Sequence, residues 1–240
     1  MRFALASEHQ DFFSKHHYIE FEDLISLNDV ENLKQSIETT LAKRLHCKVQ
    51  DLDNRSEQDL YKAGRDLWRE DLNIKKTLFR PEICEIASSL FSKNPLRLGF
   101  DQAFRSSSFK REDLFKPPLS LQEISCLKDL CGAFIVRLSE DAPSLDRFNH
   151  DVPKKASFGR DFFFPHPQKR ENLLFLSPQL LLTFQPLFNK SAQHFLLVSF
   201  CKDKTTYVLE KKDPNTHALK NQGYAFGDLL KNNTHPIVFR

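Results

Sequence analysis

The spacing of apolar residues in this 240-residue chain changes near Pro95, and this change constrains the fold more than any other feature. Before it, apolar residues recur with the period of a helix, as in Val30, Leu33 and Ile37. After it, short apolar runs have the two-residue period of strands, beginning with residues 96–104. Helices followed by many short strands argue against an alternating β/α fold. The pattern favours a small barrel or double-sheet jelly roll with helices packed outside it.

Helices are predicted within the first 93 residues. Ser26 is a suitable N-cap for the helix that carries the apolar series above. A second helix is expected over residues 56–70. A third should begin at Pro81, which suits a first helical turn, and end near Lys93.

Strands are predicted in the remainder, at residues 96–104, 133–138, 173–176, 195–200 and 205–209. The stretch 139–170 is polar, rich in proline and weakly periodic, so we expect a long excursion there that covers one mouth of the barrel. We therefore predict an α+β fold in a single domain, residues 1–240. Residues 1–93 would form a mainly helical layer, and residues 94–240 a double-stranded β-helix core (jelly roll, cupin-like).

Composition limits the partners and the cellular location expected for the protein. The net charge is only +3, and basic residues alternate with acidic ones, as at 110–113, so no nucleic-acid partner is expected. No apolar run approaches the roughly 20 residues of a membrane span, so no membrane partner is expected. Five widely spaced cysteines without a CxxC motif indicate free thiols in a reducing cytoplasm. The predicted location is cytoplasmic.

Common catalytic signatures are absent from the sequence. The six glycines form neither GxGxxG nor GxxxxGK, which disfavours a Rossmann or P-loop enzyme. GxSxG and HExxH are also missing, so an α/β-hydrolase and a helical zinc protease are not supported.

Two segments, 118–125 and 171–181, resemble the iron-ligand segments of the phytanoyl-CoA dioxygenase-like family of Fe(II)/2-oxoglutarate oxygenases. Residues 95–102 resemble the first core strand of that family. In the family, a His-x-Asp pair is followed much later by a distal histidine. The matching positions here are Leu121, Glu123 and Leu181.

The resemblance implies the fold more strongly than the activity. Two imidazoles and one carboxylate hold the family's iron. Leu121 and Leu181 offer no donor atom, although Glu123 keeps a carboxylate. The arginine that would pair with 2-oxoglutarate aligns near His194, which is shorter and largely neutral at pH 7. We therefore expect no cofactor; Fe(II) and 2-oxoglutarate are expected only if non-standard ligands serve.

The expected pocket follows from these positions. Leu121 and Glu123 are two residues apart, so a strand would aim both inward, close to Leu181. Glu123 would then be poorly solvated, and its pKa should rise. The residues predicted to line the pocket are Gln102, Leu121, Gln122, Glu123, Leu181 and His194.

Other residues are weak candidates for metal ligands. His150 and Asp151 are adjacent, and adjacent residues on a strand point to opposite faces. His166 precedes a proline, which is typical of an extended surface turn. We predict no metal, with Glu123 and these three residues as the alternatives.

Three functions remain open. The first is an oxygenase-fold protein that is degenerate at the iron site and binds an unknown small molecule or protein. The second is an active oxygenase that combines Glu123 with histidines from residues 139–170. The third is a structural or interaction protein unrelated to oxygenases.

Overall fold

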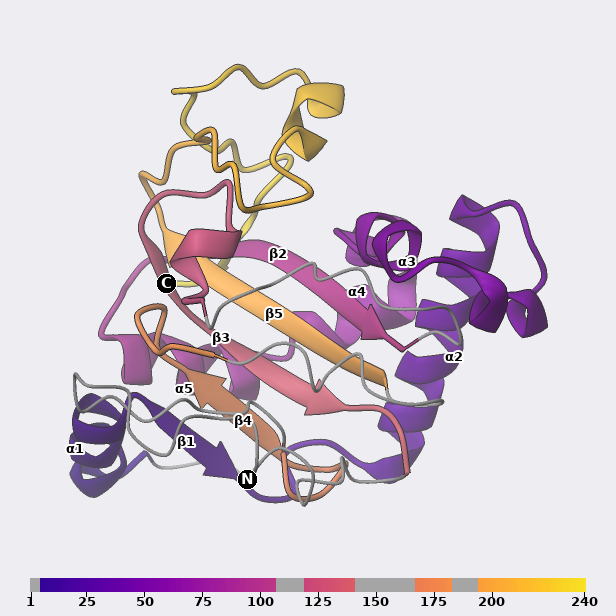
Figure 1. Cartoon of the computed structure of the whole chain (residues 1–240). Coiled ribbons are helices and arrows are strands. Elements are labelled where there is room, and N and C mark those ends of the chain that lie inside the picture. Colours follow the sequence, from indigo (N-terminus) through magenta and orange to yellow (C-terminus); the bar gives the residue numbers. More distant parts are fainter. Residues whose placement is uncertain (1–4, 107–118, 141–166, 183–193) are drawn as a thin grey trace, which may run out of the picture.

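A six-stranded antiparallel sheet lies at the centre of the protein, in the order β1-β4-β3-β5-β2-β6 (Figure 1). The computed structural model describes residues 5–106, 119–140, 167–182 and 194–240. The strands are β1 (Tyr18–Phe21), β2 (Leu96–Arg105), β3 (Leu130–Arg137), β4 (Leu173–Leu176), β5 (His194–Lys202) and β6 (Ile237–Phe239). The predictions for β2, β3, β4 and β5 are confirmed.

Most helices precede the long strand β2. They are α1 (Ser7–His16), α2 (Leu27–Arg44), α3 (Glu57–Ala63), α4 (Leu72–Leu78) and α5 (Pro81–Phe91). Short 3₁₀ helices are η1 (Val49–Asn54), η2 (Leu67–Arg69), η3 (Gln122–Ile124) and η6 (Ala218–Gln222). No described helix is long and apolar enough to cross a membrane.

Two helix starts follow their local signals. The Ser26 hydroxyl accepts a hydrogen bond from the backbone N–H of Asp29 at 3.2 Å, which caps α2 as predicted. Pro81 occupies the first turn of α5, where its missing N–H costs nothing. Both elements could therefore be predicted from residues within one turn of their starts.

The predicted helix over residues 56–70 starts as expected, with Ser56 as the N-cap of α3, but its predicted length is wrong, because α3 ends at Ala63. Gly64 follows, and a Cβ there would lie 2.8 Å from the carbonyl oxygen of Ala103 in β2. The chain thus approaches the sheet too closely for a continuing helix. Asp66 then adopts a left-handed conformation with φ 57°, and η2 begins directly after it.

The predicted strand at 205–209 is also wrong. Only isolated bridges occur there, between Leu127 and Tyr207 and between Thr206 and Leu229. Conversely, α1 and β1 lie in a region where no element was specified. The central part of the predicted excursion, residues 141–166, lies outside the described residues.

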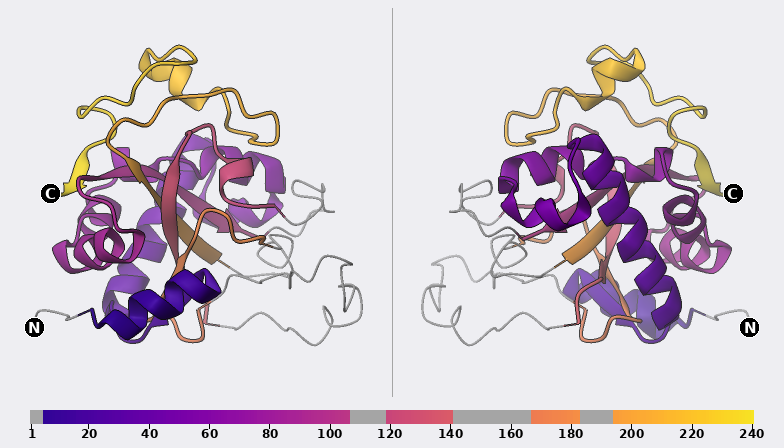
Figure 2. Two further views of the ribbon diagram at one scale, coloured as in Figure 1. Left: turned by 90° about the vertical axis from the view of Figure 1, so that its left-hand side faces the viewer. Right: turned by 90° about the vertical axis from the view of Figure 1, so that its right-hand side faces the viewer.

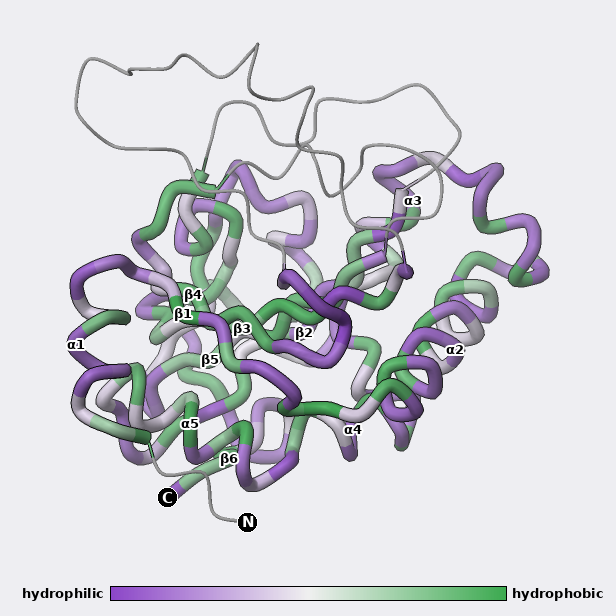
Figure 3. The backbone as a smooth tube through the Cα atoms, turned by 90° about the horizontal axis from the view of Figure 1, so that it is seen from below, coloured by the Kyte–Doolittle hydropathy of each residue, from purple (hydrophilic) through white to green (hydrophobic). Residues whose placement is uncertain are grey.

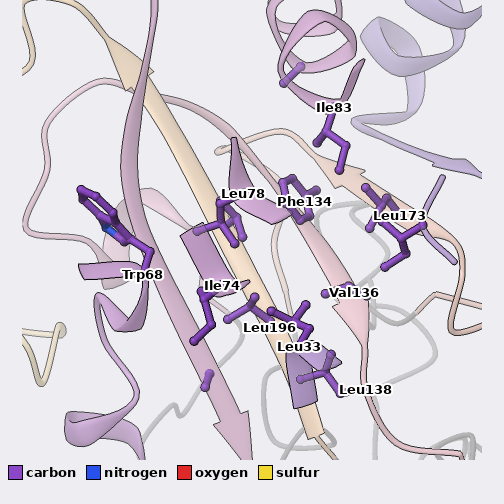
Figure 4. Close-up of a cluster of buried hydrophobic side chains, with 14 of the residues drawn as sticks. Leu33, Trp68, Ile74, Leu78, Ile83, Phe134, Val136, Leu138, Leu173 and Leu196 are labelled. Atoms are coloured by element: carbon purple, nitrogen blue, oxygen red, sulfur yellow. The ribbon is translucent and has the colours of Figure 1, made fainter. Parts of the chain in front are cut away.

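Both faces of the sheet are buried, each by a different part of the chain. On one face, residues of α2, α4 and α5 share a hydrophobic cluster with β3 and β5 (Figure 4). The side views show α2 and α5 on the same side of the sheet (Figure 2). The opposite face packs against segments 119–130 and 205–230 in a second cluster. Hydrophobic residues accordingly concentrate on the central strands (Figure 3).

The two-residue period of residues 96–104 is typical of a strand with one buried face, but all ten residues of β2 are buried. A change of register between Leu98 and Asp101 turns the strand locally. Beyond it, Ala103 belongs to the helix-covered face, whereas Phe100 and Phe104 belong to the other. Polar residues on β2 must therefore find partners inside the protein.

Asp101 is one such residue, and we predict that it makes stability depend on pH. Its carboxylate is fully buried and accepts hydrogen bonds from the backbone N–H groups of Leu67 and Trp68 at 3.0 and 3.2 Å. Burial, reinforced by nearby Asp66, raises the pKa of Asp101 to about 7. The native state then binds more protons than the unfolded chain between about pH 4 and 7, so this group's stabilisation is lost as the pH rises through that window.

Urea unfolding from pH 4 to 8 tests this expectation in wild type and Asp101→Asn. The unfolding free energy of the wild type should fall relative to that of the variant by up to roughly 1.4 kcal/mol per pH unit. Parallel pH profiles for the two proteins would show that Asp101 titrates normally.

Candidate functional site

The two segments predicted to carry iron ligands lie side by side over the second cluster. The backbone N–H of Leu119 donates to the carbonyl of Leu182 at 3.1 Å, and the reverse bond measures 3.0 Å. The N–H of Gln122 also approaches the carbonyl of Pro178 at 3.4 Å. Residues far apart in the sequence therefore meet at this place.

The predicted strand conformation of Leu121 and Glu123 is wrong. Leu121 has helical dihedral angles, and η3 follows immediately. The Ser120 hydroxyl accepts from the N–H of Glu123, while the Glu123 carboxylate accepts from the N–H of Ser120 at 2.9 Å. This reciprocal pattern is a capping box, encoded by Ser-x-x-Glu at residues 120–123. Helical geometry consequently turns the two side chains to different sides: Leu121 is fully buried, and Glu123 faces solvent.

The Glu123 carboxylate is bound by other residues of the same chain. Its side chain is 39% exposed, and its second oxygen lies 2.7 Å from Nζ of Lys212. Burial alone would raise the pKa of Glu123, but hydrogen bonds from Lys212 and Ser120 outweigh it and lower the pKa. The expected rise is therefore wrong.

Apolar side chains lie at and beside two of the positions that the family resemblance assigns to iron ligands. Leu119, Leu121 and Leu182 are buried in the second cluster, and Leu181 is half-buried beside them. Leucine has no donor atom, so these residues do not fit an iron ion. Among the described residues, no three His, Cys, Asp or Glu side chains are placed to hold a metal. His150, Asp151 and His166 lie outside the described residues.

His194 lies on the opposite face of the sheet from Leu121, which corrects its predicted position in the pocket. Strand alternation places it with Leu196, on the helix-covered face. Its Nδ1 is 3.3 Å from the Glu38 carboxylate of α2. Burial and the nearby Arg105 guanidinium lower the pKa of His194 to about 3. A neutral, buried ring beside Glu38 does not supply the positive charge of the arginine that the resemblance implies.

Gln102 does face the inner side, but structural hydrogen bonds occupy its amide. Nε2 donates to the carbonyls of Tyr61 and Ala103 at 2.8 and 2.9 Å. Oε1 accepts from Nε of Arg65 at 2.9 Å and from Asn215 at 3.3 Å. Gln102 thus joins α3, β2 and the C-terminal segment.

The same network contains a buried ion pair that the sequence analysis missed. Nη2 of Arg65 lies 3.1 Å from Oδ1 of Asp213, with side chains 5% and 0% exposed. Burial would lower the pKa of Arg65, but Asp213 offsets this and raises it. Asp213 also accepts from the backbone N–H groups of Cys126 and Asn215, both at 2.9 Å. The guanidinium lies 3.8 Å from the ring centre of Phe100.

A cavity among the described residues lies beyond the end of the sheet where β3 begins and β4 ends. It has a volume of about 870 Å³ and lies between the C-terminal ends of α1 and α5, the turn at 128–131 and the turn at 177–179. We call it the α1–α5 groove. Gln122 lines the groove and fixes the segment at 127–130 through two hydrogen bonds. Its Nε2 donates to the Leu127 carbonyl at 2.8 Å, and its Oε1 accepts from the Leu130 N–H at 3.1 Å.

No protein-family model and no curated protein sequence matches the chain. Solved structures do resemble it. The epimerase SnoN in complex with Fe³⁺, α-ketoglutarate and nogalamycin RO has a TM-score of 0.63 at 12% identity, over 97% of this chain and 98% of that one. The α-ketoglutarate-dependent carbocyclase SnoK has a TM-score of 0.61 at 14% identity, over 97% and 96%. CytC3 has 0.53 at 11%, over 86% and 81%.

These neighbours establish the fold class. The mixed helices and antiparallel sheet form an α+β, cupin-like fold shared with non-haem oxygenase-fold proteins. At such identities the likeness concerns the fold, and function has to be argued from the residues described above.

Proposed function

We propose that this chain is an oxygenase-fold protein with a degenerate iron site, acting as a binding module for a small molecule or a protein. The observation that carries the proposal is the pair of segments at 119–123 and 178–182. They meet as ligand segments would, yet Leu121 and Leu182 fill the interior and Glu123 turns outward to Lys212.

An active oxygenase with non-standard ligands is the alternative. It would need Glu123 as a ligand, and both oxygens of that carboxylate already accept hydrogen bonds from Ser120 and Lys212. The position of His194 beside Glu38 also supports the absence of 2-oxoglutarate binding. A structural protein unrelated to oxygenases fits less well, because the fold is shared with that class.

The proposal includes the cellular setting. All five cysteines are free thiols, which supports a reducing cytoplasm. The small net charge supports a partner other than a nucleic acid, and we propose no membrane partner.

Metal analysis of protein purified without a chelator tests the degenerate site. We expect far less than one iron per chain, and no micromolar affinity for Fe(II) or 2-oxoglutarate in calorimetric titrations. Glu123→Gln should leave both results unchanged, because it is not expected to be a ligand. Stoichiometric iron that is lost in Glu123→Gln would establish the alternative instead.

A further inference from the structure

We propose that the α1–α5 groove binds an amphipathic organic anion, an aromatic or aliphatic body that carries a carboxylate, sulfonate or phosphate. This inference rests on the proposed function, since it names the site and ligand class of the small-molecule binding module. The groove lies at the end of the sheet and does not require an iron site.

The size and floor of the groove suit a small organic ligand. Its volume of about 870 Å³ falls within the range of roughly 300–1,000 Å³ typical of ligand pockets. The side chains of Phe13, Leu90, Phe91 and Leu130 line it and are otherwise buried. They offer an apolar surface against which a ligand body can pack.

The charges around the groove favour an anion. Three lysines, Lys93, Lys128 and Lys202, line it against two aspartates, Asp11 and Asp129. Lys202 pairs with Asp129 at 3.7 Å. Within the described part of the chain, Lys93 and Lys128 form no ion pair, so their charges are available to a ligand.

Cys131 lies near two of these lysines, Lys93 and Lys202. Its thiol is half-buried in the groove, and burial raises its pKa to about 11, although Lys93 and Lys202 act to lower it. The thiol is therefore neutral at pH 7 and does not neutralise either ammonium group. An anionic group of a ligand over Cys131 would do so.

The carbonyl groups near the two helix ends that border the groove do not compete with a ligand for the lysine ammonium groups. Near the end of α5, the carbonyl of Ser88 accepts from the N–H of Lys93, and the carbonyl of Ser89 accepts from the N–H of Ser92 and from Nε2 of Gln10. The carbonyl of Phe13 in α1 accepts from the N–H of His17 at 2.8 Å. Because these carbonyls already have partners, they do not occupy the ammonium groups of Lys93 and Lys128.

A matched pair of probes tests the ligand class. 1-Anilinonaphthalene-8-sulfonate carries one sulfonate, and N-phenyl-1-naphthylamine is its uncharged parent. Fluorescence titration should show one saturable sulfonate site per chain that weakens with added salt, and clearly weaker binding of the parent. Lys93→Glu and Lys128→Glu should each weaken sulfonate binding about tenfold. Lys62→Glu, the same charge change on α3, should have no effect.

A second pair of variants and a labelling experiment test the location. Ser14→Trp on the groove side of α1 should abolish sulfonate binding by filling the groove, whereas Lys15→Trp, one residue away and outside its lining, should not. Bound sulfonate should also slow alkylation of Cys131 by iodoacetamide, measured by peptide mass spectrometry. Cys47 is half-buried at another place and serves as the internal control.

The inference is overturned if Lys93→Glu and Lys128→Glu bind like wild type, if the uncharged parent binds as tightly as the sulfonate, or if Cys131 is not protected. Circular dichroism of every variant distinguishes lost binding from lost folding. If these tests fail and the protein is free of iron, the groove inference is wrong but the proposal of a degenerate iron site is not contradicted. Stoichiometric iron would contradict the proposed function, whatever the groove binds.

Discussion

Asp213→Ala is expected to lower the free energy of unfolding by about 3–5 kcal/mol, because it leaves the Arg65 guanidinium buried without a counter-ion. The backbone N–H groups of Cys126 and Asn215 lose an acceptor at the same time. Urea denaturation with matched m-values measures the loss.

Two further variants make this result specific. Glu22→Ala removes an ion pair with Lys169 at 3.8 Å in which both side chains are mostly exposed, so it should cost less than about 1 kcal/mol. The double variant Arg65→Met/Asp213→Leu removes both buried charges and should recover part of the lost stability. If Asp213→Ala costs no more than Glu22→Ala, the ion pair does not anchor the C-terminal segment.

Phe134→Ala is expected to cost a similar amount, about 3–5 kcal/mol, through a cavity in the helix-covered cluster. Phe134 on β3 is buried, and its ring lies 5.8 Å from that of Phe175 and 6.0 Å from that of Phe200. These two neighbours belong to β4 and β5, the strands on either side of β3, and cannot collapse into the space without moving the sheet.

Phe12→Ala is the matched control for this experiment. Phe12 on α1 is 41% exposed, and its truncation should cost less than about 1 kcal/mol. Thermal and urea unfolding of the two variants should therefore differ clearly. Equal losses would mean that the aromatic cluster does not dominate the stability of the core.

Elements whose signals are local could be predicted. The N-cap at Ser26, Pro81 at a first turn and the apolar runs of β3 and β5 each act within a few residues. The short strand β1 has no such signal. It exists because its residues pair with β4, about 150 positions later, as Ile19 does with Phe175.

At the candidate site, a local signal was present but the prediction followed the family resemblance. Ser-x-x-Glu at 120–123 is a local capping-box pattern, but the family resemblance placed a strand there instead. The local pattern alone would have predicted that the Glu123 side chain points outward. The partner of that carboxylate, Lys212, could not be predicted because it lies 89 residues away.

By itself, the sequence determined α2, α5 and the strands β2 to β5, and the apolar character of positions 121 and 181, because these depend on residue type and short-range spacing. Only the tertiary structure decided which groups meet. It brings Arg65 against Asp213, places His194 on the helix-covered face, and forms the α1–α5 groove from five segments that are distant in the sequence. Such contacts depend on how elements pack across the sheet, and no spacing along the chain encodes that packing.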